Sequence, residues 1–210
     1  MSRLITTSLL SSIDWFNNCP PDWKDKAFKD LNNTLARIWT TPNPAAQRGM
    51  TFEKLLYDVL RRGNENRVTC SDKFKEVMKA CKGGIFQKKI KKFIEIDGNE
   101  YCLFGKLDVD LPEKIIDIKT TGNYKGRMNY LKSMQHKLYC YITKKSKFEY
   151  IIAEFYGDSG PIEKVHYIPY EVDYWEKIEE EIIEKIREAI NFLKTDEEIF
   201  ELYTTKYSLY

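Results

Sequence analysis

The sequence predicts an α/β sandwich in which helices flank a central mixed β-sheet. Three observations predict it. Segments with helical periodicity precede the centre of the chain, three strand-like runs follow at residues 86–96, 100–110 and 114–120, and a further helical segment leads to another strand-like run at residues 150–156. The order helix, three-strand meander, helix, strand is typical of this architecture.

The chain length and composition predict one soluble globular domain. The chain has 210 residues, of which 42% are hydrophobic and 31% charged. We expect an N-terminal helical entry segment over residues 1–48, a core over 49–170 and a C-terminal helix over 171–210. No apolar stretch approaches the length of a membrane span, and the N-terminus lacks a signal-like apolar core. Five irregularly spaced cysteines suit a reducing compartment, so a cytoplasmic location is expected.

The first half of the chain contains three predicted helices, at residues 8–18, 24–39 and 50–62, with a loop at 40–44. In the third helix an apolar stripe follows the helical period. Glu53 lies at the edge of that stripe, and Gly49, near the expected helix start, would allow a backbone or a phosphate to approach Glu53 closely. A solvated boundary residue is the alternative for Glu53. The stripe comprises Phe52, Leu55, Leu56, Val59 and Leu60.

A helix at residues 72–80 leads into the strands. Asp97-Gly98-Asn99 is a strong hairpin signal between the first two. The lysine-rich run at residues 88–92 is either a phosphate-binding segment or an edge strand protected from aggregation by its lysines.

The second hairpin carries the clearest chemical signal. Its turn, at residues 111–114, places Asp110 opposite Ile115 and Asp108 opposite Asp117. Directly opposed residues have Cβ atoms about 5 Å apart, and like charges so placed repel each other. A divalent cation would remove that repulsion, and Mg²⁺ is typically held by one or two carboxylates with phosphate and water. Lys119 shares a face with Asp117, whereas Ile118 points into apolar packing; Asp and Lys on a solvated strand face are the alternative.

Further along the chain, a stripe of Leu131, Met134, Leu138 and Ile142 predicts a helix with Gln135 and Tyr139 along its border. These two residues either face the hairpin site or pack at the rim of the core. The loop at residues 121–126 is expected to be mobile and to clamp a nucleic acid strand. His136 and His166 are interpreted as surface or boundary residues. Turn residues at 157–161, a strand at 164–169 and an acidic helix at 173–194 complete the predicted elements.

Charge is unevenly distributed along the chain. Residues 151–210 contain six basic and fifteen acidic residues, a net charge of −9, whereas residues 1–150 contain 28 and 17, a net charge of +11. Arg48, Lys125 and Arg127 are candidate phosphate contacts in the basic part. Solvated surface charges are the alternative.

Taken in order, Gly49-x-x-x-Glu53, Gly105-x-x-Asp108, Asp117-x-Lys119 and Gln135-x-x-x-Tyr139 resemble the motifs of the PD-(D/E)XK nuclease superfamily, in its RecB-like and lambda-type exonuclease branch. The resemblance implies a restriction-endonuclease-like three-layer core. It implies that Glu53, Asp108, Asp117 and Lys119 are catalytic, and that Glu53, Asp108, Asp117 and Ile118 bind Mg²⁺, for which Mn²⁺ would substitute. Gln135 and Tyr139 would line the DNA-binding side. Many RecB-like members carry His at the position of Glu53, so the number of bound metal ions, one or two, remains open.

The function implied is hydrolysis of DNA phosphodiester bonds, most simply by a phage-like exonuclease that processes DNA ends in recombination or repair. A CRISPR-associated or helicase-linked nuclease and a non-catalytic nucleic-acid-binding module are the alternatives. Possible partners besides DNA are a second copy of the chain, an annealing protein or a helicase. The cysteines, at positions 19, 70, 81, 102 and 140, are too scattered for the iron–sulfur cluster of some relatives, so no cluster is expected. The sequence does not predict the polarity of cleavage, the preference for single- or double-stranded DNA, or exonuclease rather than endonuclease action.

Overall fold

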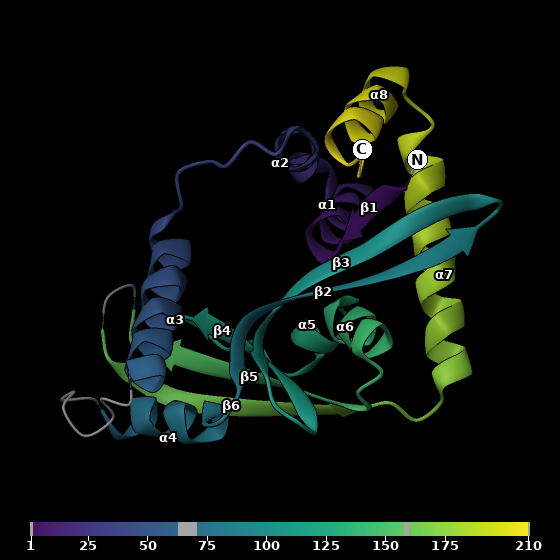
Figure 1. Ribbon diagram of the computed structural model, residues 1–210. Coiled ribbons are helices and arrows are strands. Elements are labelled where there is room, and N and C mark those ends of the chain that lie inside the picture. Colours follow the sequence, from purple (N-terminus) through teal and green to yellow (C-terminus); the bar gives the residue numbers. More distant parts are fainter. Residues whose placement is uncertain (1, 63–70, 158–159, 210) are drawn as a thin grey trace.

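The computed structural model describes residues 2–62, 71–157 and 160–209 of the chain (Figure 1). Cys70 and part of the predicted turn at 157–161 lie outside these residues. The strands form a mixed sheet in the order β1-β3-β4-β5-β6, with β2 paired to β3. Their bounds are β1 (Arg3–Thr6), β2 (Ile85–Ile96), β3 (Asn99–Asp110), β4 (Lys114–Thr121), β5 (Lys147–Phe155) and β6 (Ile162–Glu171).

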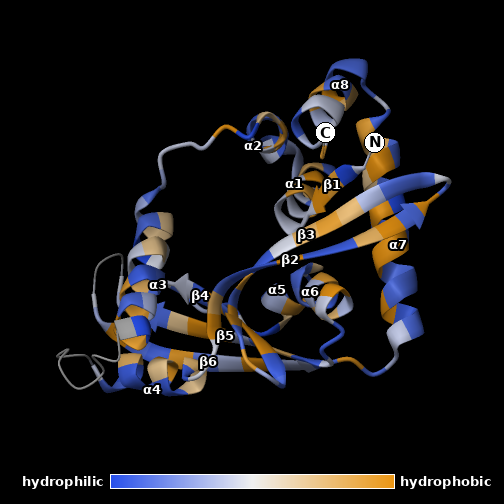
Figure 2. Ribbon diagram, in the orientation of Figure 1, coloured by the Kyte–Doolittle hydropathy of each residue, from blue (hydrophilic) through white to orange (hydrophobic). Residues whose placement is uncertain are grey.

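Helices cover both faces of the sheet, as the sequence predicted. The helices are α1 (Thr7–Asn18), α2 (Lys24–Ala36), α3 (Pro44–Arg62), α4 (Asp72–Cys81), α5 (Met128–Leu131), α6 (Gln135–Thr143), α7 (Trp175–Leu193) and α8 (Glu197–Lys206), with a 3-10 turn, η1 (Pro21–Trp23), after α1. Hydrophobic and hydrophilic residues alternate around α3 and α7 (Figure 2). Apolar residues of α3 and α4 form one core with β4 and β5, and those of α1, α6, α7 and α8 form another on the opposite side.

The β2–β3 hairpin is long and turns at the predicted place. Asp97 and Gly98 have φ values of 52° and 73°, which are the left-handed conformations that a tight hairpin turn of this kind requires. β2 pairs only with β3 and forms an edge of the sheet. The lysine-rich run therefore lies on an edge strand.

The other edge of β3 is shared by two strands. β1 pairs in parallel with residues 101–104 of β3, and β4 pairs antiparallel with Val109 and Asp110. Asp110 faces Ile115, as the turn predicted. The ladder ends at Val109–Ile116, one pair before Asp108 would face Asp117. The sheet therefore opens between β1 and β4, beside Asp108.

β4 runs parallel to β5, which runs antiparallel to β6. The predicted face separation on β4 holds: Ile116 and Ile118 pack in the core below α3 and α4, and Asp117 points away from it. β5 and β6 are longer than the predicted strands, since pairing with β4 continues β5 back to Lys147.

Several helix boundaries differ from the prediction. α3 begins at Pro44 because the Asn43 side chain accepts a hydrogen bond from Ala46 N at 2.8 Å, so the predicted loop ends with a helix cap. Gly49 is consequently inside the helix, where an added Cβ would lie 3.0 Å from Thr120 Oγ1. α2 ends at Ala36 because Arg37 adopts a left-handed conformation.

The predicted helix from Leu131 to Ile142 is two helices, α5 and α6, joined near Met134. The strand β1, the 3-10 turn η1 and the helix α8 were not predicted. β1 pairs with β3, and α8 follows α7 and joins the chain ends: Leu4 N donates to Tyr207 O at 2.7 Å, and Leu209 N donates to Ser2 O at 3.0 Å. Among the described residues, none of the helices has the length and apolar character needed to cross a bilayer.

Candidate active site

Asp108 lies near the end of β3, where the sheet opens. Its carboxylate accepts two hydrogen bonds, from the backbone N of Ile118 at 2.8 Å and from Gln87 Nε2 at 3.3 Å. The first bond takes the place of a ladder bond between β3 and β4. Burial raises the pKa of Asp108 well above its ordinary value, and repulsion from Asp117 and Glu53 adds to the increase.

Asp117 and Lys119 lie on β4 two residues apart. The Asp117 side chain is only 2% exposed, and Gln135 Nε2 donates to its Oδ1 at 2.5 Å. Lys119 Nζ is 2.7 Å from Asp117 Oδ2, in an ion pair that lacks the alignment of a hydrogen bond. Burial alone would lower the pKa of Lys119, but attraction by Asp117 and Asp108 outweighs it and leaves the pKa above its ordinary value. The ammonium is therefore protonated at neutral pH.

Glu53 approaches from α3 and is partly buried. Tyr57, one turn further along α3, donates its hydroxyl to Glu53 Oε2 at 3.3 Å. Burial raises the pKa of Glu53, and the charge of Asp117 raises it further. Glu53 is thus electrostatically coupled to the carboxylates on the strands.

This group of carboxylates has the chemistry of a site for a hard divalent cation, which prefers oxygen ligands. Two features fit such an ion: the charge of Asp117 helps to raise the pKa values of Asp108 and Glu53, and the buried Asp117 Oδ2 accepts no aligned hydrogen bond from the described residues. Within those same residues, however, no three Asp, Glu, His or Cys side chains are grouped closely enough to hold a metal by themselves. Asp108 and Asp117 lie on the neighbouring strands β3 and β4, and Glu53 lies on α3.

α6 supports the site through Gln135 and Tyr139. Gln135 is the first residue of the helix, and its amide holds Asp117. Tyr139 is 4% exposed, and its hydroxyl donates to the Lys106 carbonyl at 3.4 Å. Its ring lies against Gly105, where an added Cβ would be only 2.4 Å from Tyr139 Cε1. Gln135 therefore faces the carboxylates, whereas Tyr139 packs in the core behind them.

The three candidate phosphate contacts lie in different settings. Arg48, on α3, donates to the Gly157 carbonyl at 2.9 Å and lies over the Phe155 ring at 5.2 Å. Lys125 and Arg127 are exposed in the segment between β4 and α5. Of the three, these two present their charges to solvent.

The segment between β4 and α5 is anchored, in contrast to the mobile loop expected. Tyr124 N donates to Glu154 at 3.0 Å, and the Tyr124 ring stacks on His166 with centroids 3.8 Å apart. His166 in turn lies 2.8 Å from the other oxygen of Glu154. These contacts tie the segment to β5 and β6.

The prediction that His136 is a surface or boundary residue is wrong. His136 is 1% exposed, and its Nδ1 lies 3.2 Å from the Tyr150 hydroxyl. Burial lowers the pKa of His136 to about 4, so the imidazole is neutral at physiological pH. The histidine had no evident partner nearby in the sequence, and the structure buries it because α6 is buried on several sides and not along the predicted stripe alone.

Two further residues were missed. Tyr57 and Gln87 both lie within hydrogen-bond distance of the carboxylates or of each other. Gln87 is on β2, and only the pairing of β2 with β3 brings it beside Asp108. The sequence signal was weak, because a single Gln beside a lysine run has no evident partner.

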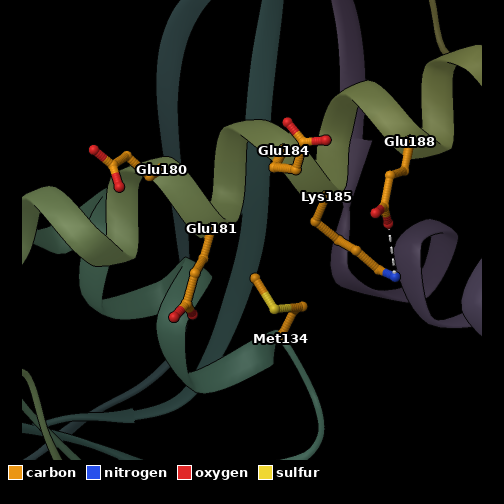
Figure 3. Close-up of a pocket in the computed structure, with 6 residues that line it drawn as sticks. All are labelled: Met134, Glu180, Glu181, Glu184, Lys185 and Glu188. Carbon is orange, nitrogen blue, oxygen red and sulfur yellow. Dashed lines mark hydrogen bonds and ion pairs between the residues drawn. The ribbon is translucent and has the colours of Figure 1, made fainter.

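A separate hollow lies beneath α7 and is not part of this site. Figure 3 shows Glu180, Glu181, Glu184, Lys185 and Glu188 along α7, with Glu181 and Lys185 on either side of Met134. Four carboxylates would repel nucleic acid phosphates, and none of the predicted site residues lines the hollow. The site defined by Asp108 and Asp117 is therefore the better candidate for chemistry on a phosphate.

The solved structures that share this fold include two structures of one exonuclease. The alkaline exonuclease LHK-Exo from Laribacter hongkongensis is 14% identical, with a TM-score of 0.55 over 96% of this chain and 92% of that one. The same enzyme in complex with dAMP is 16% identical, with a TM-score of 0.52 over the same shares of both chains. A protein called SSO0001 is also 16% identical, with a TM-score of 0.54 over 91% of this chain and 77% of that one.

At these identities the likeness establishes a shared fold. The predicted α/β fold with a mixed central sheet is confirmed, and LHK-Exo shares this fold. No protein-family model matches the sequence, and no curated protein sequence is significantly similar to it.

Proposed function

We propose that this chain, as a single domain, is a metal-dependent nuclease that hydrolyses DNA phosphodiester bonds. One observation carries the proposal: Asp108 lies where β3 and β4 separate, Asp117 forms an ion pair with Lys119 on β4, and hydrogen bonds from Ile118, Gln87 and Gln135 hold the two carboxylates. Buried carboxylates that repel one another destabilise the fold, so their presence is better explained by a functional role than by a contribution to stability.

Asp108 and Asp117, with the Ile118 carbonyl and Glu53, are the residues proposed to hold Mg²⁺ or Mn²⁺. Such an ion polarises the phosphate and compensates the charge on the departing oxygen. The protein groups have their own tasks. Asp117 and Gln135 fix the position of Lys119, and the protonated ammonium of Lys119 stabilises the negative charge that develops on the phosphate.

In the proposed reaction a water oxygen bonds to phosphorus and gives up a proton to solvent, while the bond from phosphorus to one sugar oxygen breaks and that oxygen takes up a proton from solvent. The raised pKa of Lys119 favours electrostatic stabilisation over proton abstraction as its task. Exposed Lys125 and Arg127 are proposed to contact phosphates further along the strand, with salt-dependent affinity.

We favour an exonuclease acting on DNA ends, because the fold is shared with LHK-Exo along almost the whole of both chains. A non-catalytic DNA-binding module on the same fold is the second candidate. The ion pair of Asp117 with Lys119 and the electrostatic interaction of Asp108 with both residues argue against it.

The test is cleavage of end-labelled linear DNA and closed circular DNA by the purified protein with Mg²⁺, with Mn²⁺ and with a chelator. The variants Asp117→Asn and Lys119→Met remove charge while preserving side-chain size, and Asp173→Asn, at an exposed position outside the site, is the matched control. We expect metal-dependent loss of linear DNA by wild type and the control, and a decrease of at least about 100-fold in the two site variants. Equal cleavage by all four proteins would refute the proposed site.

A further inference from the structure

We propose that Gln87, held by Tyr57, is a positioning residue that fixes Asp108 in the orientation needed to bind the metal ion. The inference rests on the proposed nuclease function and assigns a task to two residues outside the motifs described above. It is drawn from the geometry of β2, α3 and β3 around one carboxylate.

Gln87 interrupts an otherwise regular strand pair. Phe86 pairs with Val109 and Lys88 pairs with Leu107, so Gln87 lies opposite Asp108. Its φ of 56° is in the left-handed region, although neither a turn nor a glycine is present at this point of β2. Residues with a Cβ adopt this conformation at a cost, and such outliers concentrate at functional sites.

The irregularity also affects β3. Leu107 and Val109 are two residues apart and would normally point to the same face of the sheet. They pack instead in the two different hydrophobic cores. The distorted step of the β2–β3 ladder therefore coincides with Asp108, which lies between them.

The unusual backbone brings the Gln87 amide to two acceptors. Nε2 donates to Tyr57 OH at 2.9 Å and to Asp108 Oδ1 at 3.3 Å. Tyr57 OH in turn donates to Glu53 Oε2 at 3.3 Å. The donors and acceptors of this series are mutually consistent. Gln87 donates one amide hydrogen to Asp108 and the other to Tyr57, and Tyr57 donates its hydroxyl hydrogen to Glu53.

The arrangement parallels that of Asp117. One carboxamide from another element holds one oxygen of each carboxylate: Gln135 of α6 for Asp117, and Gln87 of β2 for Asp108. Groups that orient metal ligands in this way typically affect metal affinity or activity by about 10- to 100-fold when removed. Gln87 has the geometry for such a contribution, and Tyr57 sets the orientation of its amide.

Gln87→Gly is the decisive variant, because glycine adopts a positive φ without strain and so removes the amide while keeping the backbone. Arg37→Gly is the matched control, since Arg37 has φ of 55° at the end of α2, outside the site. Tyr57→Phe removes one hydroxyl and serves as a second, independent variant. The measurements are thermal unfolding, calorimetric titration with Mn²⁺, and kcat and KM for linear DNA.

We expect Gln87→Gly to unfold at nearly the wild-type temperature, to bind Mn²⁺ about 10-fold more weakly and to lose about 10- to 100-fold in kcat. Tyr57→Phe should show a smaller loss of the same kind, and Arg37→Gly none. Wild-type Mn²⁺ affinity and kcat in both Gln87→Gly and Tyr57→Phe would overturn the inference while leaving the proposed function intact. If wild-type protein itself neither binds Mn²⁺ nor cleaves DNA, the proposed function fails, and this inference fails with it.

Discussion

The ring of Tyr139 lies against Gly105, so closely that any side chain at position 105 would collide with it. This contact joins α6 to the stretch of β3 between its pairings with β1 and β4. Two motif residues that are far apart in the sequence thus form one structural unit behind Asp108. Their spacing in the sequence gives no hint of this contact.

Gly105→Ala should therefore disturb the site through packing. An added Cβ 2.4 Å from Tyr139 Cε1 forces the ring or the strand to move, and overpacking of this kind typically costs about 1–3 kcal/mol. Urea unfolding measures the loss in stability, and DNA cleavage measures the effect on the site. Gly83→Ala is unsuitable as a control because Gly83 has a positive φ; Ser11→Ala, at an exposed position, is a better one. Unchanged stability and activity in Gly105→Ala would contradict the packing described.

Gln135→Met should reduce activity more than stability. Met preserves side-chain length but cannot donate to Asp117 Oδ1, which loses the bond from Gln135 Nε2. Loss of a partner by a buried polar group typically costs about 1–3 kcal/mol, whereas misplacement of a metal-binding carboxylate typically costs about 10- to 100-fold in activity. Steady-state kinetics and urea unfolding of Gln135→Met and of the exposed control Gln47→Met check this. Equal kcat values for the two variants would show that Gln135 has no part in the site.

Asp108→Asn should stabilise the protein in the absence of divalent ions. The pKa of Asp108 is higher in the folded state than the ordinary value of 3.8, so the folded protein binds more protons than the unfolded chain above that value. Stability attributable to Asp108 is therefore lost as the pH rises from 3.8 through the folded pKa. Asparagine removes this loss because it does not ionise.

Thermal unfolding in a chelator at pH 8 should show an increase of about 2–4 °C for Asp108→Asn, which corresponds to about 1 kcal/mol for a chain of this size. Excess Mn²⁺ should raise the melting temperature of wild type and leave that of Asp108→Asn nearly unchanged. A lower melting temperature for Asp108→Asn in the chelator would mean that the carboxylate stabilises the fold.

His136 should make the protein sensitive to acid. Its pKa falls from 6.5 in a model peptide to about 4 in the folded protein, so the unfolded chain binds the proton first as the pH decreases. Stability from the neutral imidazole is present above pH 6.5 and is lost as the pH falls toward 4. Between pH 7 and pH 5 this loss is about 2 kcal/mol.

His136→Gln keeps a polar group near the Tyr150 hydroxyl but does not titrate. Urea unfolding at pH 7 and pH 5 should show a smaller decrease for this variant than for wild type. His166→Gln provides the control at the other histidine, which is only partly buried. Identical decreases in wild type and His136→Gln would contradict the buried neutral histidine.

The sequence predicted the parts of the fold that depend on local signals. The turn at residues 111–114 set the register of Asp110 and Ile115, and Asp97 with Gly98 marked the longer hairpin. Long-range pairing escaped prediction: β1 is short, and its partner residues lie in the middle of β3. Pro44 was assigned to a loop, although its position just after a capping Asn is favourable for a helix start.

The residues of the candidate site also fall into those that the sequence predicted and those that it did not. Lys119 and Gln135 contact Asp117, and Asp108 accepts a hydrogen bond from the neighbouring Ile118 N, because the hairpin and the start of α6 place these residues there. The spacing of the motifs in the sequence had singled out all four residues. Gln87 could not be found, because its amide reaches Asp108 only through a left-handed residue in β2 that no periodicity indicates.

A crystal structure of the protein soaked with Mn²⁺ and measured at the manganese absorption edge tests the proposed metal site. We predict an anomalous peak coordinated by one oxygen of Asp108 and one of Asp117, in wild-type protein and not in Asp117→Asn. A protein that diffracts with full Mn²⁺ in the soak and shows no peak between these two carboxylates, or shows the ion at another site, would contradict the central claim.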